Sequence, residues 1–409
     1  MRSIKLIFFF CLVVTLSACV QKLWQISYSS FENDYTHGKT LVLTHDSIYL
    51  AGFTFSSESS DNKGAFVSRF DSNGTLLWGT LVTEAASNMS TVASGNVLAV
   101  DGGGYSYLVW GGLNTGVLRL YKLDPQGHVV DDWPILEGPS GPVFADDVQI
   151  DSYNRIVISA NKGRELIAFS TEGELLWKHS FGGGFPTNPQ ERVTLIPLVD
   201  GRILHANQKE LRIIEGDGAS FRAVTTGEVG VEQFQGADVL GDKVGVAASS
   251  LVDVRLMWFD FELQMQSEVV VGGNSDEMRI SSAGDHLCLV RVSQIVEEAP
   301  VVLSVTQFDM SGITAQTDLS IAPQPFWELG GLKANNKGCL VAESFGEFEV
   351  GVSSRIAQID SSGALKEEFV VDDHYLLAFD ALGNEVVRSG LTGDYDGSFT
   401  AMSLVKVRR

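Results

Sequence analysis

The stretch Phe70–Trp78 reads FDSNGTLLW: an apolar anchor, an acid, a glycine three residues later, and an apolar run ending in tryptophan. Clear copies are LDPQGHVVDDW (Leu123–Trp133) and FSTEGELLW (Phe169–Trp177), and weaker copies begin at Ile214, Phe259, Phe308 and Ile359. Successive copies are 53, 46, 45, 45, 49 and 51 residues apart, measured at the residue after each anchor: Asp71, Asp124, Ser170, Glu215, Asp260, Asp309 and Asp360. A period of about 40–50 residues is typical of repeat folds such as the β-propeller, in which each repeat forms one blade.

Each repeat has room for four strands. The segments of the first repeat are TLVLTH (Thr40–His45), SIYLAGFT (Ser47–Thr54), AFVSRFD (Ala65–Asp71) and TLLWGTL (Thr75–Leu81). They are rich in apolar residues and are separated by glycine, asparagine and aspartate, which favour tight turns. The 42 glycines among 409 residues also fit a chain with many turns. We therefore expect an all-β protein.

The two ends of the chain predict how the blades of the propeller close into a ring. Seven full repeats fit between about residues 31 and 371, and Asp372–Arg409 supplies only three more strands. The missing fourth strand is KLWQISYS (Lys22–Ser29), whose Leu-Trp resembles that of the later hairpins. Closure removes the exposed strand edges of an open ring. The sequence thus predicts an eight-bladed β-propeller, closed by an N-terminal strand added to the C-terminal blade, as a single domain over residues 23–409.

The first residues are interpreted as a targeting segment. Arg2 and Lys5 precede the apolar run Leu6–Leu16, which is too short to span a bilayer and is typical of a signal peptide. The following Leu-Ser-Ala-Cys resembles the bacterial lipobox, which implies a signal peptide over residues 1–18, lipid attachment at Cys19 and a tether over residues 19–22. The alternative is an ordinary secretory signal with a chance cysteine. Val20 after the cysteine favours the periplasmic face of the outer membrane.

The charge of the chain bears on its ligands, and its cysteines bear on disulfide formation. The formal net charge of −22 disfavours nucleic acid as a ligand. Beyond Cys11 and Cys19, two cysteines remain, Cys288 and Cys339. They lie one repeat apart, and an oxidising periplasm permits a disulfide between them. The alternative is that both are small buried apolar residues in core strands.

The tryptophan hairpins also carry a family resemblance. AFSTEGELLWKHSFGG (Ala168–Gly183) resembles the quinoprotein-like (PQQ-like) propeller repeat, and its tryptophan is expected to pack between blades. Together with the lipobox, the chain is similar in architecture to the propeller lipoprotein of the outer-membrane β-barrel assembly machine. The resemblance implies a non-catalytic, monomeric scaffold that binds envelope proteins. The weaker repeats lack the tryptophan, and no partner-binding loop can be matched residue by residue.

Motifs for catalysis are absent from the sequence. No adjacent cysteines, HExxH motif, Gly-x-Ser-x-Gly motif or phosphate-binding loop is present. Asp394 and Asp396 have the spacing of a calcium loop but lack its further ligands. We therefore expect no cofactor, no metal and no catalytic residue. The alternative is a carbohydrate-binding, ligand-binding or enzymatic propeller that uses the central channel.

Long loops offer candidate partner sites. They are expected at Ser56–Gly64, Gly182–Glu191, Glu297–Pro300, Ala322–Trp327 and Ser344–Val350. Their aromatic residues are Phe185, Phe326, Trp327, Phe345 and Phe348. Exposed aromatics on one face suggest a binding surface, although the rings could instead pack over the blades. The short tether predicts that this face points away from the bilayer.

Overall fold

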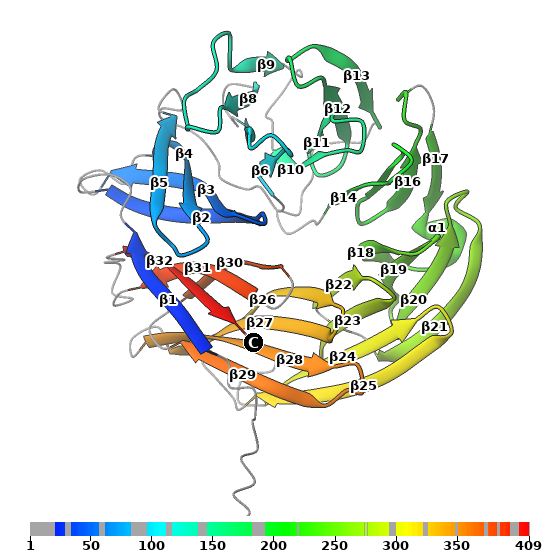
Figure 1. Ribbon diagram of the computed structural model, residues 1–409. Coiled ribbons are helices and arrows are strands. Elements are labelled where there is room, and N and C mark those ends of the chain that lie inside the picture. The colour runs from blue at the N-terminus through cyan, green and yellow to red at the C-terminus, as the bar shows by residue number, and fades with distance from the viewer. Residues whose placement is uncertain are drawn as a thin grey trace, which may run out of the picture.

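The structure is a computed structural model that describes residues 21–28, 34–56, 62–82, 96–111, 117–137, 145–181, 193–218, 221–273, 275, 277–293, 300–321, 326–347, 351–371, 375–382, 385–392 and 401–408. The strands form eight antiparallel sheets of four strands each, arranged around a common centre (Figure 1). The chain is an eight-bladed β-propeller, as the repeats predict.

The first four blades follow the chain in order. Blade 1 contains β2 (Asp34–Leu43), β3 (Ser47–Ser56), β4 (Asn62–Asp71) and β5 (Leu76–Val82). Blade 2 contains β6 (Leu98–Val100), β7 (Ser106–Gly111), β8 (Leu118–Leu123) and β9 (Ile135–Glu137). Blade 3 contains β10 (Ala145–Ile150), β11 (Ile156–Ala160), β12 (Glu165–Phe169) and β13 (Leu175–Ser180). Blade 4 contains β14 (Thr194–Pro197), β15 (Ile203–Ala206), β16 (Glu210–Ile214) and β17 (Phe221–Thr225).

The other four blades complete the ring. The one-turn helix α1 (Thr226–Val229) leads into blade 5, which contains β18 (Gln233–Leu240), β19 (Lys243–Ser249), β20 (Asp253–Asp260) and β21 (Met265–Gly273). Blade 6 contains β22 (Glu277–Ala283), β23 (His286–Ser293), β24 (Val301–Asp309) and β25 (Gly312–Ile321). Blade 7 contains β26 (Phe326–Asn335), β27 (Gly338–Glu347), β28 (Gly351–Asp360) and β29 (Leu365–Val371). Blade 8 contains β30 (Tyr375–Leu382), β31 (Glu385–Thr392), β32 (Ala401–Arg408) and β1 (Gln21–Tyr28).

The ring closes as expected at blade 8. Strand β1 pairs antiparallel with β32, from Gln21 opposite Arg408 to Tyr28 opposite Met402. In Figure 1 the two ends of the chain, β1 and β32, accordingly lie side by side. Blade 8 then packs on blade 1 through an apolar cluster that includes Val387 and Leu404. The first and last parts of the chain therefore bury each other's strand edges and faces.

Blades pack on their neighbours through shared apolar cores. One cluster joins Tyr107 and Leu120 of blade 2 to Ile156 and Ile158 of blade 3. The first strands of neighbouring blades contact one another, as β18 contacts β22 and β2 contacts β30, so these strands surround the centre. Each blade thus depends mainly on its two neighbours, as in other repeat folds.

The turns have a common geometry that the repeat explains. We call the side that carries the turns between first and second, and between third and fourth, strands the turn face, and the opposite side the loop face. In the turn after β4, Asp71 Oδ1 accepts the backbone N–H of Asn73 and of Thr75, both at 2.8 Å. Gly74 ends the turn at a φ of 85°, which glycine adopts without strain. The aspartate and glycine of the repeat therefore build the turn.

The tryptophans of the repeat pack across blade boundaries, as expected. Trp78 of blade 1 donates from Nε1 to the backbone oxygen of Pro125 in blade 2, at 2.9 Å. Its ring lies where a Cβ on Gly127 would be. Trp177 of blade 3 lies in the same way over Gly218 of blade 4. The glycine of one turn thus makes room for the tryptophan of the preceding blade.

Cys288 on β23 and Cys339 on β27 form a disulfide with a Cα–Cα distance of 5.9 Å. Both residues are fully buried. The bridge joins the second strands of blades 6 and 7, so of the two alternatives for these cysteines the disulfide is the one observed.

No helix within the described residues is long and apolar enough to cross a membrane. Cys19 and the 393–400 segment, with its calcium-like spacing, lie outside those residues.

Candidate functional site

Three of the five aromatic residues proposed for partner loops lie in strands. Phe326 and Trp327 begin β26, and Phe345 lies within β27. The expectation of loops at these three positions was wrong, because the β26–β27 ladder continues to Phe326 opposite Gly346 and pairs the backbone groups there. Phe185 and Phe348 lie outside the described residues.

Trp327 and Phe345 instead belong to a polar cluster within blade 7. Trp327 Nε1 donates to Glu343 Oε2 at 2.6 Å, and Arg355 pairs with both Glu343 and Glu368. The side chain of Glu343 is buried, which raises the pKa of its carboxyl, while Arg355 opposes the rise. The guanidinium of Arg355 lies 5.9 Å from the centre of the Phe345 ring. The two aromatic rings therefore cover a buried ion pair, and both are half-buried.

A second buried cluster, between blades 3 and 4, contains a serine and a histidine like a catalytic pair, but the hydrogen bond between them runs in the opposite direction. His205 Nε2 lies 3.2 Å from Ser159 Oγ, and Arg212 Nη1 lies 3.1 Å from His205 Nδ1. An arginine can only donate, so Nδ1 must accept and Nε2 carries the proton. Burial lowers the pKa of His205 well below its usual value, which keeps the ring neutral. His205 therefore donates to Ser159 and cannot act as its base.

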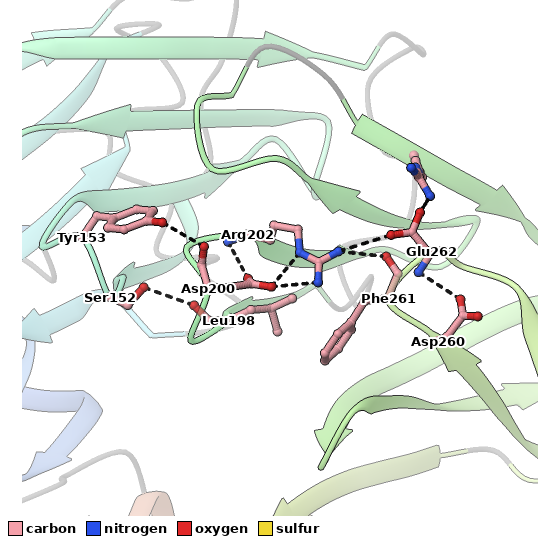
Figure 2. A network of polar contacts seen from close by, with 9 residues as sticks. Ser152, Tyr153, Leu198, Asp200, Arg202, Asp260, Phe261 and Glu262 are labelled. Carbon is pink, nitrogen blue, oxygen red and sulfur yellow. Dashed lines mark hydrogen bonds and ion pairs between the residues drawn. The ribbon is translucent and has the colours of Figure 1, made fainter.

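An accessible hollow lies on the turn face between blades 3 and 4. It has a volume of about 650 Å³ and opens to solvent. The residues that line it come from the first turn of blade 3 and the two turns of blade 4: Tyr153, Asp200, Arg202, Glu215, Gly216 and Asp217. Figure 2 shows Tyr153 and Arg202 on opposite sides of Asp200.

Tyr153 is held firmly although its side chain is largely exposed. It follows Asp151, whose Oδ1 accepts its backbone N–H at 3.0 Å, and its hydroxyl donates to the backbone oxygen of Asp200 at 3.0 Å. The ring packs against Gly201, where a Cβ would overlap it. On its other side Arg155 lies 5.2 Å from the ring centre and pairs with Asp151 at 2.5 Å. The residue is 61% exposed.

Arg202 continues the same network into blade 5. It pairs with Asp200 at 2.7 Å and donates to the backbone oxygen of Phe261 at 3.3 Å. Its guanidinium also lies 5.2 Å from the centre of the Phe261 ring and 3.8 Å from Glu262. The hydrogen bond from Arg202 lowers the pKa of Asp200. Three neighbouring blades thus fix the polar groups around the hollow (Figure 2).

This arrangement is suited to recognition. It offers a fixed aromatic face, a guanidinium and several carboxylates whose positions are set by short turns. Among the described residues no group of three His, Cys, Asp or Glu side chains could hold a metal ion. Sequence reasoning missed these residues, since they come from turns nearly one repeat apart. The available signal was Tyr153 within DSYNR, an exposed aromatic in an aspartate turn where small residues usually suffice.

Comparisons with known proteins bear on the fold. No family profile matches the chain, and no curated protein matches it. Among solved structures it is similar to dihydro-heme d1 dehydrogenase NirN, with 13% identity over 82% of this chain and 66% of that one, and a TM-score of 0.50. It is also similar to an inactive virginiamycin B lyase from Staphylococcus aureus, with 12% identity over 79% and 98% of the two chains and a TM-score of 0.48. The WD40 domain of Toxoplasma gondii coronin has 14% identity over 79% and 82%, with a TM-score of 0.48. Similarity at this level concerns the propeller fold and leaves the function open.

Proposed function

We propose that the protein is a non-catalytic, lipid-anchored propeller of the cell envelope that binds a partner protein at the hollow between blades 3 and 4. The observation that carries this proposal is the exposed Tyr153 beside the partly buried Arg202, both held in place at the rim of the hollow. Tyrosine and arginine are the residue types that most often dominate protein interfaces. Because hydrogen bonds across three blades already hold both side chains, little entropy is lost when a partner binds.

The shape of the hollow favours a protein over a small molecule. Small-molecule sites are mostly enclosed and apolar, with a few polar groups that fix orientation. This hollow is open, and its lining is charged apart from Tyr153 and Gly216. Such a surface suits a polar segment of another protein, which can add its own apolar contacts around the tyrosine.

The proposed anchor and the hollow lie at opposite edges of the turn face. Strand β1 begins at Gln21, opposite Arg408, at the turn-face end of blade 8. In a ring of eight, blade 4 lies across the centre from blade 8, and Figure 1 places the β14–β17 sheet opposite the sheet of β1. A lipid on Cys19 would therefore hold one edge of the ring at the membrane, with the hollow on the far edge.

The binding site is tested by photocrosslinking in intact envelopes. A benzophenone amino acid is placed at Tyr153, at Leu251 on the loop face, or at Asn73 on the turn face of blade 1. We expect a discrete crosslinked product only from position 153, and we expect Arg202→Ala to weaken it. A product from position 251 with none from 153 would move the partner site to the loop face and refute the proposal.

The anchor is tested separately. Cells that express the full chain are grown with an alkyne-tagged fatty acid, and the protein is purified and coupled to a fluorophore. We expect labelling of the parent and none of Cys19→Ser. Equal labelling of both proteins would exclude Cys19 as the attachment point while leaving the proposal for the hollow intact.

A further inference from the structure

A buried arginine between blades 7 and 8 has no acidic partner among the residues that the structure describes. Arg388 lies on β31 and is 1% exposed. Its Nη1 donates to Ser354 Oγ at 2.9 Å and to the backbone oxygen of Ser354 at 3.3 Å. Its guanidinium carbon lies 4.9 Å from the centre of the Phe369 ring. In the described part of the chain, its Nε and Nη2 have no hydrogen-bond acceptor.

The other fully buried arginine of the described residues, and two partly buried ones, have an acid beside them. Arg212 pairs with Glu210, and Arg155 pairs with Asp151 at 2.5 Å. Arg355 pairs with the buried Glu343. Because an unpaired charge in a protein interior is strongly destabilising, Arg388 differs from these arginines in having no acidic partner among the described residues, in a chain with 51 acidic residues.

The geometry of the free groups points to one kind of ligand. Nε and Nη2 form one edge of the guanidinium, and their N–H groups point in the same direction. This fork matches the two oxygens of a carboxylate or a phosphate, which it binds through parallel hydrogen bonds. The other edge is already used by Ser354, and Phe369 stacks against the group, so the guanidinium is held in place with one edge free.

We propose that the seam between blades 7 and 8 binds an oxyanion, a carboxylate or phosphate group, at the Nε–Nη2 edge of Arg388. We expect the anion to enter along this seam, because the guanidinium lies against Phe369 of the outer strand β29, whose side chain is only partly buried. Burial lowers the pKa of Arg388 to about 9, so the group still carries its charge at neutral pH. This site is separate from the hollow on blades 3 and 4 and goes beyond the proposed function.

The test is calorimetric titration of the purified protein with inorganic phosphate, and separately with acetate, at constant ionic strength set by chloride. We expect one saturable site, a rise in melting temperature at saturation, and a loss of affinity of tenfold or more in Arg388→Lys, which keeps the charge but not the fork. Arg255→Met, which removes an arginine that already has carboxylate partners, should bind like the parent.

The two anions separate the sources of the ligand. Tighter binding of phosphate indicates a phosphate-bearing ligand, and tighter binding of acetate indicates a carboxylate. The absence of a saturable site for both anions, or equal affinity in the parent and Arg388→Lys, would overturn the proposal. If Arg388→Lys does not fold, the parent titration alone still decides whether the site exists.

Discussion

At the scale of single residues, the repeat encodes both a turn and a blade contact. The aspartate accepts two backbone N–H groups, the glycine takes a positive φ, and the tryptophan of the preceding blade covers that glycine. The turn could be predicted because its aspartate and glycine lie within one hairpin, and packing of the tryptophan between blades could be predicted from its large apolar ring. The hydrogen bonds of Arg202, Tyr153 and Arg388 were not predictable, since they join residues of different blades.

The glycine contact yields a prediction with two internal controls. Gly127→Ala combines a positive φ of 88° with overlap of the Trp78 ring, and we expect it to cost about 2–5 kcal/mol of unfolding free energy. Gly284 also has a positive φ, 63°, but nothing within 4 Å, so Gly284→Ala should cost about 1–2 kcal/mol. Gly102 lies in open space without a positive φ, so Gly102→Ala should change stability by less than about 0.5 kcal/mol. Urea unfolding measures all three, and equal effects would refute the contact with Trp78.

The buried carboxyl of Asp147 predicts that the stability of the protein depends on pH. Burial raises the pKa of this carboxyl to about 8 from an ordinary value of 3.8. Between about pH 4 and pH 8 the folded protein keeps the proton and the unfolded chain releases it, so this residue makes the protein less stable as the pH rises through that range.

Asp147→Asn removes this titration and keeps an oxygen for the amide of Gln149, which lies 3.2 Å away. We expect the variant to be more stable than the parent at pH 8, by on the order of a few kcal/mol, with the difference shrinking toward pH 4. Asp253→Asn is the control: the hydrogen bond from Arg255 lowers the pKa of Asp253, so this variant should instead lose stability at neutral pH. Parallel stability curves for Asp147→Asn and the parent would contradict the prediction.

At the scale of strands and turns, the four segments predicted for the first repeat coincide with β2 to β5 to within about three residues, except that β2 begins earlier, at Asp34. Strand β1 was expected over Lys22–Ser29 and runs over Gln21–Tyr28. The ends of β26 and β27 were missed because aromatic and acidic residues there were interpreted as loop. In the structure Trp327 on β26 donates a hydrogen bond to Glu343 on the paired strand β27, so these residues stabilise the strand pair. The hollow could not be predicted, because turns of two neighbouring blades form it.

The disulfide between β23 and β27 gives a prediction for one pair of blades. It closes a loop of 51 residues, and its removal should lower the unfolding free energy by about 2–4 kcal/mol. The double variant Cys288→Ala and Cys339→Ala should therefore melt at a lower temperature than the parent. Reduction under denaturing conditions followed by refolding should lower the parent's melting temperature to the same degree and leave the variant unchanged. A parent that is insensitive to this treatment would mean that the bridge is not formed in solution.

At the scale of the whole molecule, one blade is built from two separate parts of the chain. Blades 1 to 7 are each continuous in the chain, whereas blade 8 combines β30–β32 with β1 from the other end. This arrangement could be predicted from the number of strands in the sequence. The last repeat supplies only three strands, and a single segment with Leu-Trp precedes the first repeat. Because nearest neighbours supply most of the stability, loss of β1 should weaken blade 8 first and then its contact with blade 1.

The most direct measurement of this account is strand complementation. A chain that begins after Tyr28 should melt at a lower temperature and less cooperatively than the mature parent, because β32 becomes an open edge. A synthetic peptide with the sequence of β1, QKLWQISY, should bind it and restore the melting temperature, since an added strand can pair with a free edge, whereas a scrambled peptide should not. A truncated chain that melts like the parent, or equal rescue by the scrambled peptide, would contradict the closure of the eight-bladed ring by β1.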